Sequence, residues 1–167
     1  MAFNILSYQG KTQSSVIAMQ LCGGALFAIN YLLLGAAVGG LLNVIATVRA
    51  IVFLFKDKLK ADSVIWFVVF IASYISVYLC SFLFFDKEPS FKNLIIELLP
   101  VIGMTALNIG FRRNRDANIR RFALISSPAW LIYNITAGSI GAIACEVITL
   151  FSILIGICRH DINQKKL

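Results

Sequence analysis

Two polar side chains lie in the middle of long apolar runs, and they are the residues best suited to bind a solute. Glu146 lies within Ile140–Cys158, and Asn43 lies within Val38–Phe55. Asn43 is eight residues after Gly35 and Glu146 eight residues after Gly138, the glycines near the outer ends of the two spans, which is close to mid-depth in a membrane at ~1.5 Å per helical residue. An ionisable group at that depth is costly, so it faces a bundle interior or a wet cavity. A carboxylate there accepts hydrogen bonds from hydroxyls or an amine, or takes up a proton. The structural alternative is a pair with Arg49 or with asparagine side chains that only holds helices together.

Four further residues are candidates for the same site. Trp130 and Asn134 are four positions apart, so they share one helix face and offer an aromatic wall beside an amide. The alternative for Trp130 is an interior tryptophan whose N–H only finds a partner. Arg49 either extends its side chain to the membrane surface or provides a counter-charge for Glu146 or for an anionic solute. Asn108 lies on the inward side of the Glu146 level, where it would extend a polar path.

Pro100 is a candidate hinge, because it removes a backbone hydrogen bond inside an apolar run. The alternative is a proline that the membrane helix merely tolerates. Glu97, close to the end of the same run, is expected at the exposed interface. Catalysis finds no support, because His160 is the only histidine and no Ser-His-Asp set, metal-ligand spacing or phosphate-binding loop occurs. We therefore expect neither an enzyme, nor a cofactor, nor a metal site.

The elements that position these residues are predicted by composition. The chain has 167 residues, of which 59% are hydrophobic and 14% charged, against roughly 25% charged residues in soluble domains. The mean hydropathy is +0.85. Apolar runs of roughly 16–23 residues are long enough to cross a hydrocarbon core of about 30 Å. The sequence therefore predicts an all-α, polytopic transmembrane bundle in a single membrane domain.

Six full spans and a short N-terminal apolar segment are expected. The short segment is Met1–Gln9. The six spans are Ser14–Gly35, Val38–Phe55, Ser63–Phe85, Leu94–Phe111, Phe122–Ala137 and Ile140–Cys158. The last two spans are expected to join at Ala137-Gly138-Ser139.

Basic residues predict the orientation of the bundle. If the loop after Phe55 is cytoplasmic, twelve of the fifteen lysines and arginines lie on the cytoplasmic side, two lie outside and Arg49 lies within a span. This distribution follows the positive-inside rule and places the C-terminus in the cytoplasm. The net charge of +7 thus indicates contact with membrane lipids and not with nucleic acid. We assign the Arg112–Arg121 cluster to topology and lipid contact.

An internal repeat is predicted at an offset of 103 residues. At this offset residues 1–56 align without a gap with residues 104–159, and Asn43 aligns with Glu146. Two triple-helix repeats, 1–56 and 94–159, would flank a linker helix at 63–85, which is a 3+1+3 plan with the site between the repeats. Leu94–Gly103 has no counterpart before Met1, so the first helix is expected to be truncated or the start to be misassigned by about ten residues.

Two segments carry a family resemblance. Glu97–Gly103 reads ELLPVIG, and Trp130–Glu146 has the order Trp, Asn, Ala-Gly-Ser-Ile-Gly, Glu. Together with the span layout they resemble the YgjV-type bacterial inner-membrane proteins over essentially the whole chain. That family is similar in architecture to the PQ-loop and SWEET carriers of small solutes. The chain departs from the PQ-loop pattern, since Val101 and not glutamine follows Pro100.

The resemblance and the polar residues together predict a small-solute transporter of the bacterial inner membrane that works by alternating access between two triple-helix repeats. The alternative is a non-transporting receptor or assembly factor that binds a peptide or a lipid in the same bundle. A purely structural bundle is the third reading. The expected partners are membrane lipids and a small solute, and the sequence leaves open whether the chain forms a homo-oligomer.

Overall fold

The chain folds into helices throughout the residues that the computed structural model describes, which are 2–34, 36–84, 88–113 and 116–162. These ranges contain eight α-helices and one π-helical segment, and no strand. The helices are α1 (Ala2–Ser7), α2 (Gln13–Leu33), α3 (Ala37–Leu54), α4 (Lys56–Leu59), α5 (Val64–Phe84), α6 (Phe91–Arg112), α7 (Asp116–Thr136) and α8 (Ile140–Gly156), followed by the π-helix η1 (Ile157–Ile162). The predicted all-α fold is confirmed.

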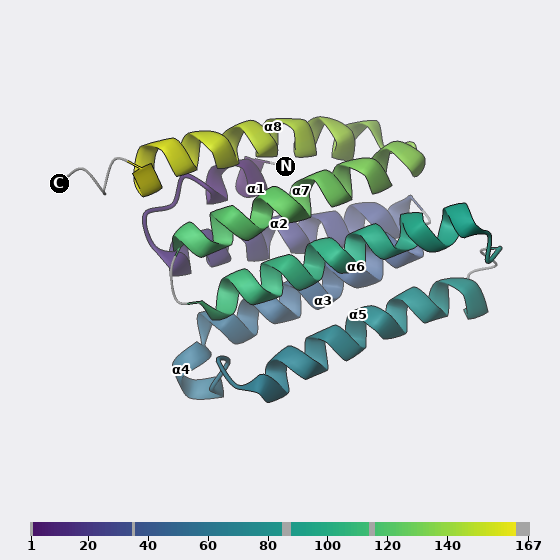
Figure 1. The fold of residues 1–167 in the computed structure, drawn as a ribbon, viewed down its shortest axis with the longest axis horizontal. Helices are drawn as coiled ribbons and strands as arrows, with labels where there is room; N and C mark the ends of the chain where they lie inside the picture. The colour runs from purple at the N-terminus through teal and green to yellow at the C-terminus, as the bar shows by residue number, and fades with distance from the viewer. Residues whose placement is uncertain (1, 35, 85–87, 114–115, 163–167) are drawn as a thin grey trace.

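Six long helices lie side by side with alternating direction, and α5 forms one edge of the bundle (Figure 1). Their outer faces are apolar. Leu33 is 83% exposed and Ile140 is 82% exposed, as expected for side chains that contact lipid. Four helices, α2, α5, α6 and the α8–η1 segment, are long and apolar enough to cross a membrane, and α3 is apolar but shorter. The count of six spans remains a prediction.

The predicted joint between the last two spans is confirmed. α7 ends at Thr136 and α8 begins at Ile140. Gly138 has φ +69°, in the left-handed region where a residue without a Cβ is favoured. The turn reverses the chain, so the candidate residues of α7 and α8 lie on neighbouring antiparallel helices.

The start of α7 departs from the prediction. The helix begins at Asp116, six residues before Phe122, so part of the predicted basic loop is helical. Arg120 is buried and forms an ion pair with Asp161, and its Nη1 donates to the carbonyl of Gly10 at 3.3 Å. The assignment of this arginine to lipid contact is therefore wrong. Arg115, in the same cluster, lies outside the described residues, as do Lys87, Lys165 and Lys166.

Helix α1 is short but fixed in place by several contacts. It packs on α2 and also contacts α8. The Gln9 side chain, just after α1, donates from Nε2 to the carbonyl of Ser152 at 2.8 Å. The Ser152 hydroxyl in turn donates to the carbonyl of Ile5. These bonds hold the N-terminal segment against α8 and inside the bundle.

The helices pack into two groups. Contacts are extensive within α1–α2–α3 and within α6–α7–α8, and smaller between the groups, where α1 meets α8, α3 meets α6 and α2 meets α7. Helix α5 contacts both α3 and α6. The repeat at 103 residues remains a prediction from sequence.

Candidate functional site

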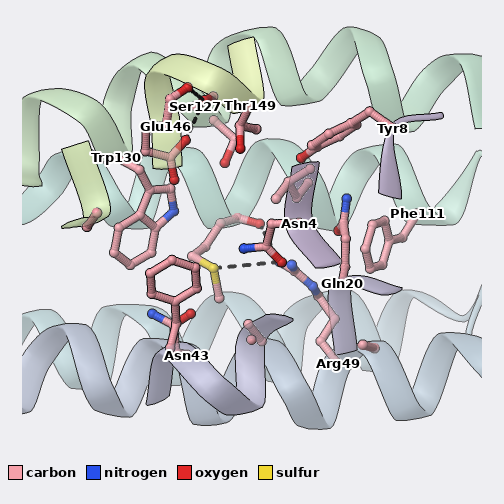
Figure 2. Close-up of a pocket in the computed structure, with 18 of the residues that line it drawn as sticks. Asn4, Tyr8, Gln20, Asn43, Arg49, Phe111, Ser127, Trp130, Glu146 and Thr149 are labelled. Carbon is pink, nitrogen blue, oxygen red and sulfur yellow. Dashed lines mark hydrogen bonds between the residues drawn. The ribbon is translucent and has the colours of Figure 1, made fainter. Parts of the chain in front are cut away.

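A cavity of about 90 Å³ lies between the helices in the middle of the bundle (Figure 2). This volume exceeds the ~10–15 Å³ that a single water needs, and is smaller than the ~300–1,000 Å³ of pockets for drug-sized ligands. The lining residues are Asn4, Tyr8, Gln20, Gly24, Phe27, Tyr31, Asn43, Ala46, Arg49, Ala50, Met104, Leu107, Phe111, Ser126, Ser127, Trp130, Ala142, Glu146 and Thr149. The space suits a solute of few atoms.

Glu146 enters the cavity from α8. It is the seventh residue of that helix, about 9 Å along its axis at ~1.5 Å per residue. The hydroxyl of Ser127, on α7, donates to its Oε2 atom. Among the described residues nothing donates to its Oε1 atom. The carboxylate is therefore held on one side by α7 and presents its other oxygen to the cavity.

Arg49 enters from α3 on another side of the cavity (Figure 2). It is 3% exposed. Its Nη1 donates to the carbonyl of Met104 at 2.9 Å and to the hydroxyl of Tyr74 at 3.1 Å, and its guanidinium lies 4.8 Å from the ring centroid of Phe111. Its Nε has no hydrogen-bond partner among the described residues. Arg49 therefore neither reaches the membrane surface nor pairs with Glu146.

Asn43 and Trp130 also line the cavity, on opposite sides of it (Figure 2). Asn43 is the seventh residue of α3, and its Nδ2 donates to the carbonyl of Gly39 at 2.8 Å, which leaves its Oδ1 for other partners. Trp130 lies on α7, 6.4 Å from the ring centroid of Tyr31, which in turn lies 6.0 Å from that of Phe27. The three rings form one aromatic wall.

Asn134 and Asn108 do not line the cavity. Asn134 accepts a hydrogen bond of 2.7 Å at its Oδ1 from the hydroxyl of Tyr31, and both side chains are buried. The bond joins α2 to α7. Asn108 is fully buried on α6, with no side-chain partner among the described residues. Neither residue reaches a solute directly in this arrangement.

Pro100 and Glu97 lie on α6. The helix continues from Phe91 to Arg112 through the proline without a break, and the hinge remains a prediction. Glu97 is 1% exposed, so its expected place at the exposed interface is wrong. It is the seventh residue of the helix, deep enough for the surrounding helices to cover it.

Several lining residues were not predicted from the sequence. Asn4 and Tyr8 belong to a segment too short to cross a membrane, which gave no reason to place them at its centre. Ser127, the hydrogen-bond donor to Glu146, looked like one of many serines in apolar runs. Tyr31 did carry a signal, because it aligns with Asn134 at the offset of 103.

The same offset relates many of the lining positions to one another. Six pairs of lining residues are separated by 103 positions. These pairs are Asn4 and Leu107, Tyr8 and Phe111, Gly24 and Ser127, Phe27 and Trp130, Asn43 and Glu146, and Ala46 and Thr149. The two helix groups therefore contribute corresponding positions to one cavity.

Comparison with protein families gives a match to Imp-YgjV, a family of bacterial inner membrane proteins, over residues 1–164. The chain belongs to the Imp-YgjV family. The resemblance carried by ELLPVIG and the Trp130–Glu146 segment is thereby confirmed, and this Imp-YgjV member is a multi-pass protein of the bacterial inner membrane. No curated protein and no solved structure matches the chain.

Proposed function

We propose that this Imp-YgjV protein binds a small polar solute in the central cavity and carries it across the inner membrane by alternating access. The observation that carries the proposal is a carboxylate and a guanidinium that line one cavity and bond to other residues instead of to each other. Burying either charge is costly unless it is paired. Glu146 and Arg49 each retain hydrogen-bonding atoms without a protein partner, and a bound solute would satisfy them.

The packing supports movement of the two helix groups relative to each other. Contacts within α1–α2–α3 and within α6–α7–α8 exceed those between the groups. A site at the interface of two units, each more tightly packed internally, is the arrangement from which rocking of one unit against the other gives access from either side. Helix α5 touches both groups and would link their movement.

Thermal stability of the purified protein tests the binding step. A panel of sugars, amines, amino acids and nucleosides is added to the protein in detergent, and a compound present at 100 times its Kd should stabilise the fold by about 2.7 kcal/mol. Glu146→Gln should abolish this stabilisation while keeping the shape of the side chain. Glu97→Gln is the matched control, because it removes a buried carboxylate that does not line the cavity.

Uptake of the stabilising compound into proteoliposomes tests the transport step. A carrier should accumulate the labelled compound in the lumen, and Glu146→Gln should reduce its rate of entry. Binding without uptake would favour a receptor or assembly factor. Stabilisation that persists in Glu146→Gln would place the solute outside this cavity and contradict the proposal.

A further inference from the structure

The charges that line the cavity sum to zero. Among the described residues that line the cavity, Glu146 is the only carboxylate and Arg49 the only basic side chain. A solute with net charge would leave one charge uncompensated in a low-dielectric interior, which is costly. A solute without net charge preserves the balance, and one with two opposite charges would also pair with both residues.

The guanidinium of Arg49 presents an unused edge. Its Nη1 is occupied by the carbonyl of Met104 and the hydroxyl of Tyr74. Its Nε is buried without a hydrogen-bond partner among the described residues, and its Nη2 donates to none of them. Nε and Nη2 together form the edge that binds a carboxylate by donating two parallel hydrogen bonds to its oxygens. The protein thus fixes one side of the guanidinium and leaves the carboxylate-binding side open.

The surroundings of Glu146 suit an ammonium group. Ser127 fixes Oε2, and Oε1 is left for a donor. The indole of Trp130 lies next to the carboxylate in the cavity (Figure 2). A cation that contacts the carboxylate and also lies over the face of the indole would gain from both the ion pair and the cation–π interaction. Glu146 and Arg49 lie on different sides of the cavity, so one small molecule can meet both (Figure 2).

We infer that the solute is a small zwitterion, such as a short amino acid, whose ammonium contacts Glu146 beside Trp130 and whose carboxylate contacts the Nε–Nη2 edge of Arg49. This inference rests on the proposed function, since it names the class of solute for the same cavity. The cavity of about 90 Å³ restricts the molecule to a compact body between its two charged ends.

Matched probes test the inference. Glycine, β-alanine and γ-aminobutyrate carry both charges at increasing separation, whereas β-alaninamide carries only the ammonium and propionate only the carboxylate. Binding is measured by isothermal titration calorimetry on the full chain in detergent, with glucose as the uncharged comparison. At least one zwitterion should bind roughly 10- to 100-fold more tightly than the amide, propionate and glucose, as expected for one charge-assisted hydrogen-bonded contact.

Variants at the two ends assign each contact. Glu146→Gln should remove the advantage of the zwitterion over propionate, and Arg49→Gln should remove its advantage over β-alaninamide. Arg49→Lys, which keeps the charge and loses the Nε–Nη2 edge, should weaken zwitterion binding roughly tenfold while leaving β-alaninamide unchanged. This variant also serves if Arg49→Gln fails to fold after losing its bonds to Met104 and Tyr74.

The outcomes separate this inference from the proposed function. Glucose or another uncharged compound could bind more tightly than every zwitterion and lose its binding in Glu146→Gln. The cavity would then be a solute site, as proposed, but the assignment of the solute as a zwitterion would be wrong. If a zwitterion binds equally well to the native protein and to Glu146→Gln, its ammonium does not contact Glu146 and the inference is wrong. Absence of binding by all three zwitterions also overturns it.

Discussion

The hydrogen bond between Tyr31 and Asn134 joins the two helix groups and gives a sharp test of the packing. It spans 2.7 Å between α2 and α7, and both side chains are buried. Tyr31→Phe keeps the ring in the aromatic wall but leaves the Asn134 carbonyl oxygen without its donor. Leaving a buried acceptor unpaired costs about 1–3 kcal/mol, whereas the coupling between hydrogen-bonded side chains in membranes averages about 0.6 and reaches about 1.7 kcal/mol. We therefore expect destabilisation at the lower end of the first range.

A double-mutant cycle measures the coupling itself. The free energy of unfolding is measured in mixed micelles for Tyr31→Phe, for Asn134→Ala and for the double variant. The double variant should be more stable than the sum of the single losses predicts, by about 0.6–1.7 kcal/mol. Tyr133→Phe is the control, since it removes the hydroxyl of another buried tyrosine of α7 that does not take part in the bond between Tyr31 and Asn134. Additive losses within about 0.3 kcal/mol would show that the bond does not hold the groups together.

Two further predictions concern α1 and the orientation of the bundle. A Cβ on Gly23 would lie 1.6 Å from the Oδ1 of Asn4, so Gly23→Ala should force the Asn4 side chain out of its place against α2 and destabilise the protein by about 1–3 kcal/mol in a micelle unfolding assay. Gly141→Ala, where no atom lies within 4 Å, should be neutral or slightly stabilising, and equal effects of the two changes would refute the contact. Cysteines at Lys58 and Arg113, in a background without native cysteines, should react with an impermeant reagent only after the inner membrane is opened. Labelling of either position from the periplasm would reverse the predicted orientation.

The helices themselves were the most predictable part of the molecule. Hydropathy placed five of the long helices within three residues of their observed ends, because an apolar run in lipid must satisfy its backbone hydrogen bonds internally. The start of α7 was misplaced because Arg120 and Arg121 suggested a loop. In the structure the guanidinium of Arg120 is neutralised by Asp161, a residue 41 positions further along the chain. Local composition does not reveal such a distant partner.

The site was predictable to the extent that polarity in an apolar run is costly. Glu146 and Asn43 stood out for this reason, and both line the cavity. The rule does not distinguish a side chain that faces a cavity from one that pairs within the core. Asn134 and Asn108 illustrate this, since the first bonds to Tyr31 and both lie outside the cavity lining.

The predicted repeat implies that corresponding positions of the two halves meet at the cavity, and none of the six pairs there is identical. Positions separated by 103 residues line one small cavity. If the two residues of a pair were identical and polar, the same chemical group would face the cavity from both sides. Two carboxylates at 43 and 146 would repel each other and both remain costly to bury. The pair instead consists of an amide and a carboxylate.

Four of the five remaining pairs also join a residue that can hydrogen-bond to one that cannot, whereas Phe27 and Trp130 are both aromatic. Asn4 and Tyr8, on the α1 side, correspond to the apolar Leu107 and Phe111 of α6. The small residues Gly24 and Ala46, on α2 and α3, correspond to the hydroxyl-bearing Ser127 and Thr149 of α7 and α8. Hydrogen-bonding groups are therefore concentrated on the side of the cavity formed by α1, α7 and α8. The side formed by α2, α3 and α6 is more apolar, and its hydrogen-bonding groups belong to Gln20, Tyr31, Asn43 and Arg49. A cavity with unlike walls holds a dipolar solute in one orientation, whereas two equal walls would hold it equally well in two.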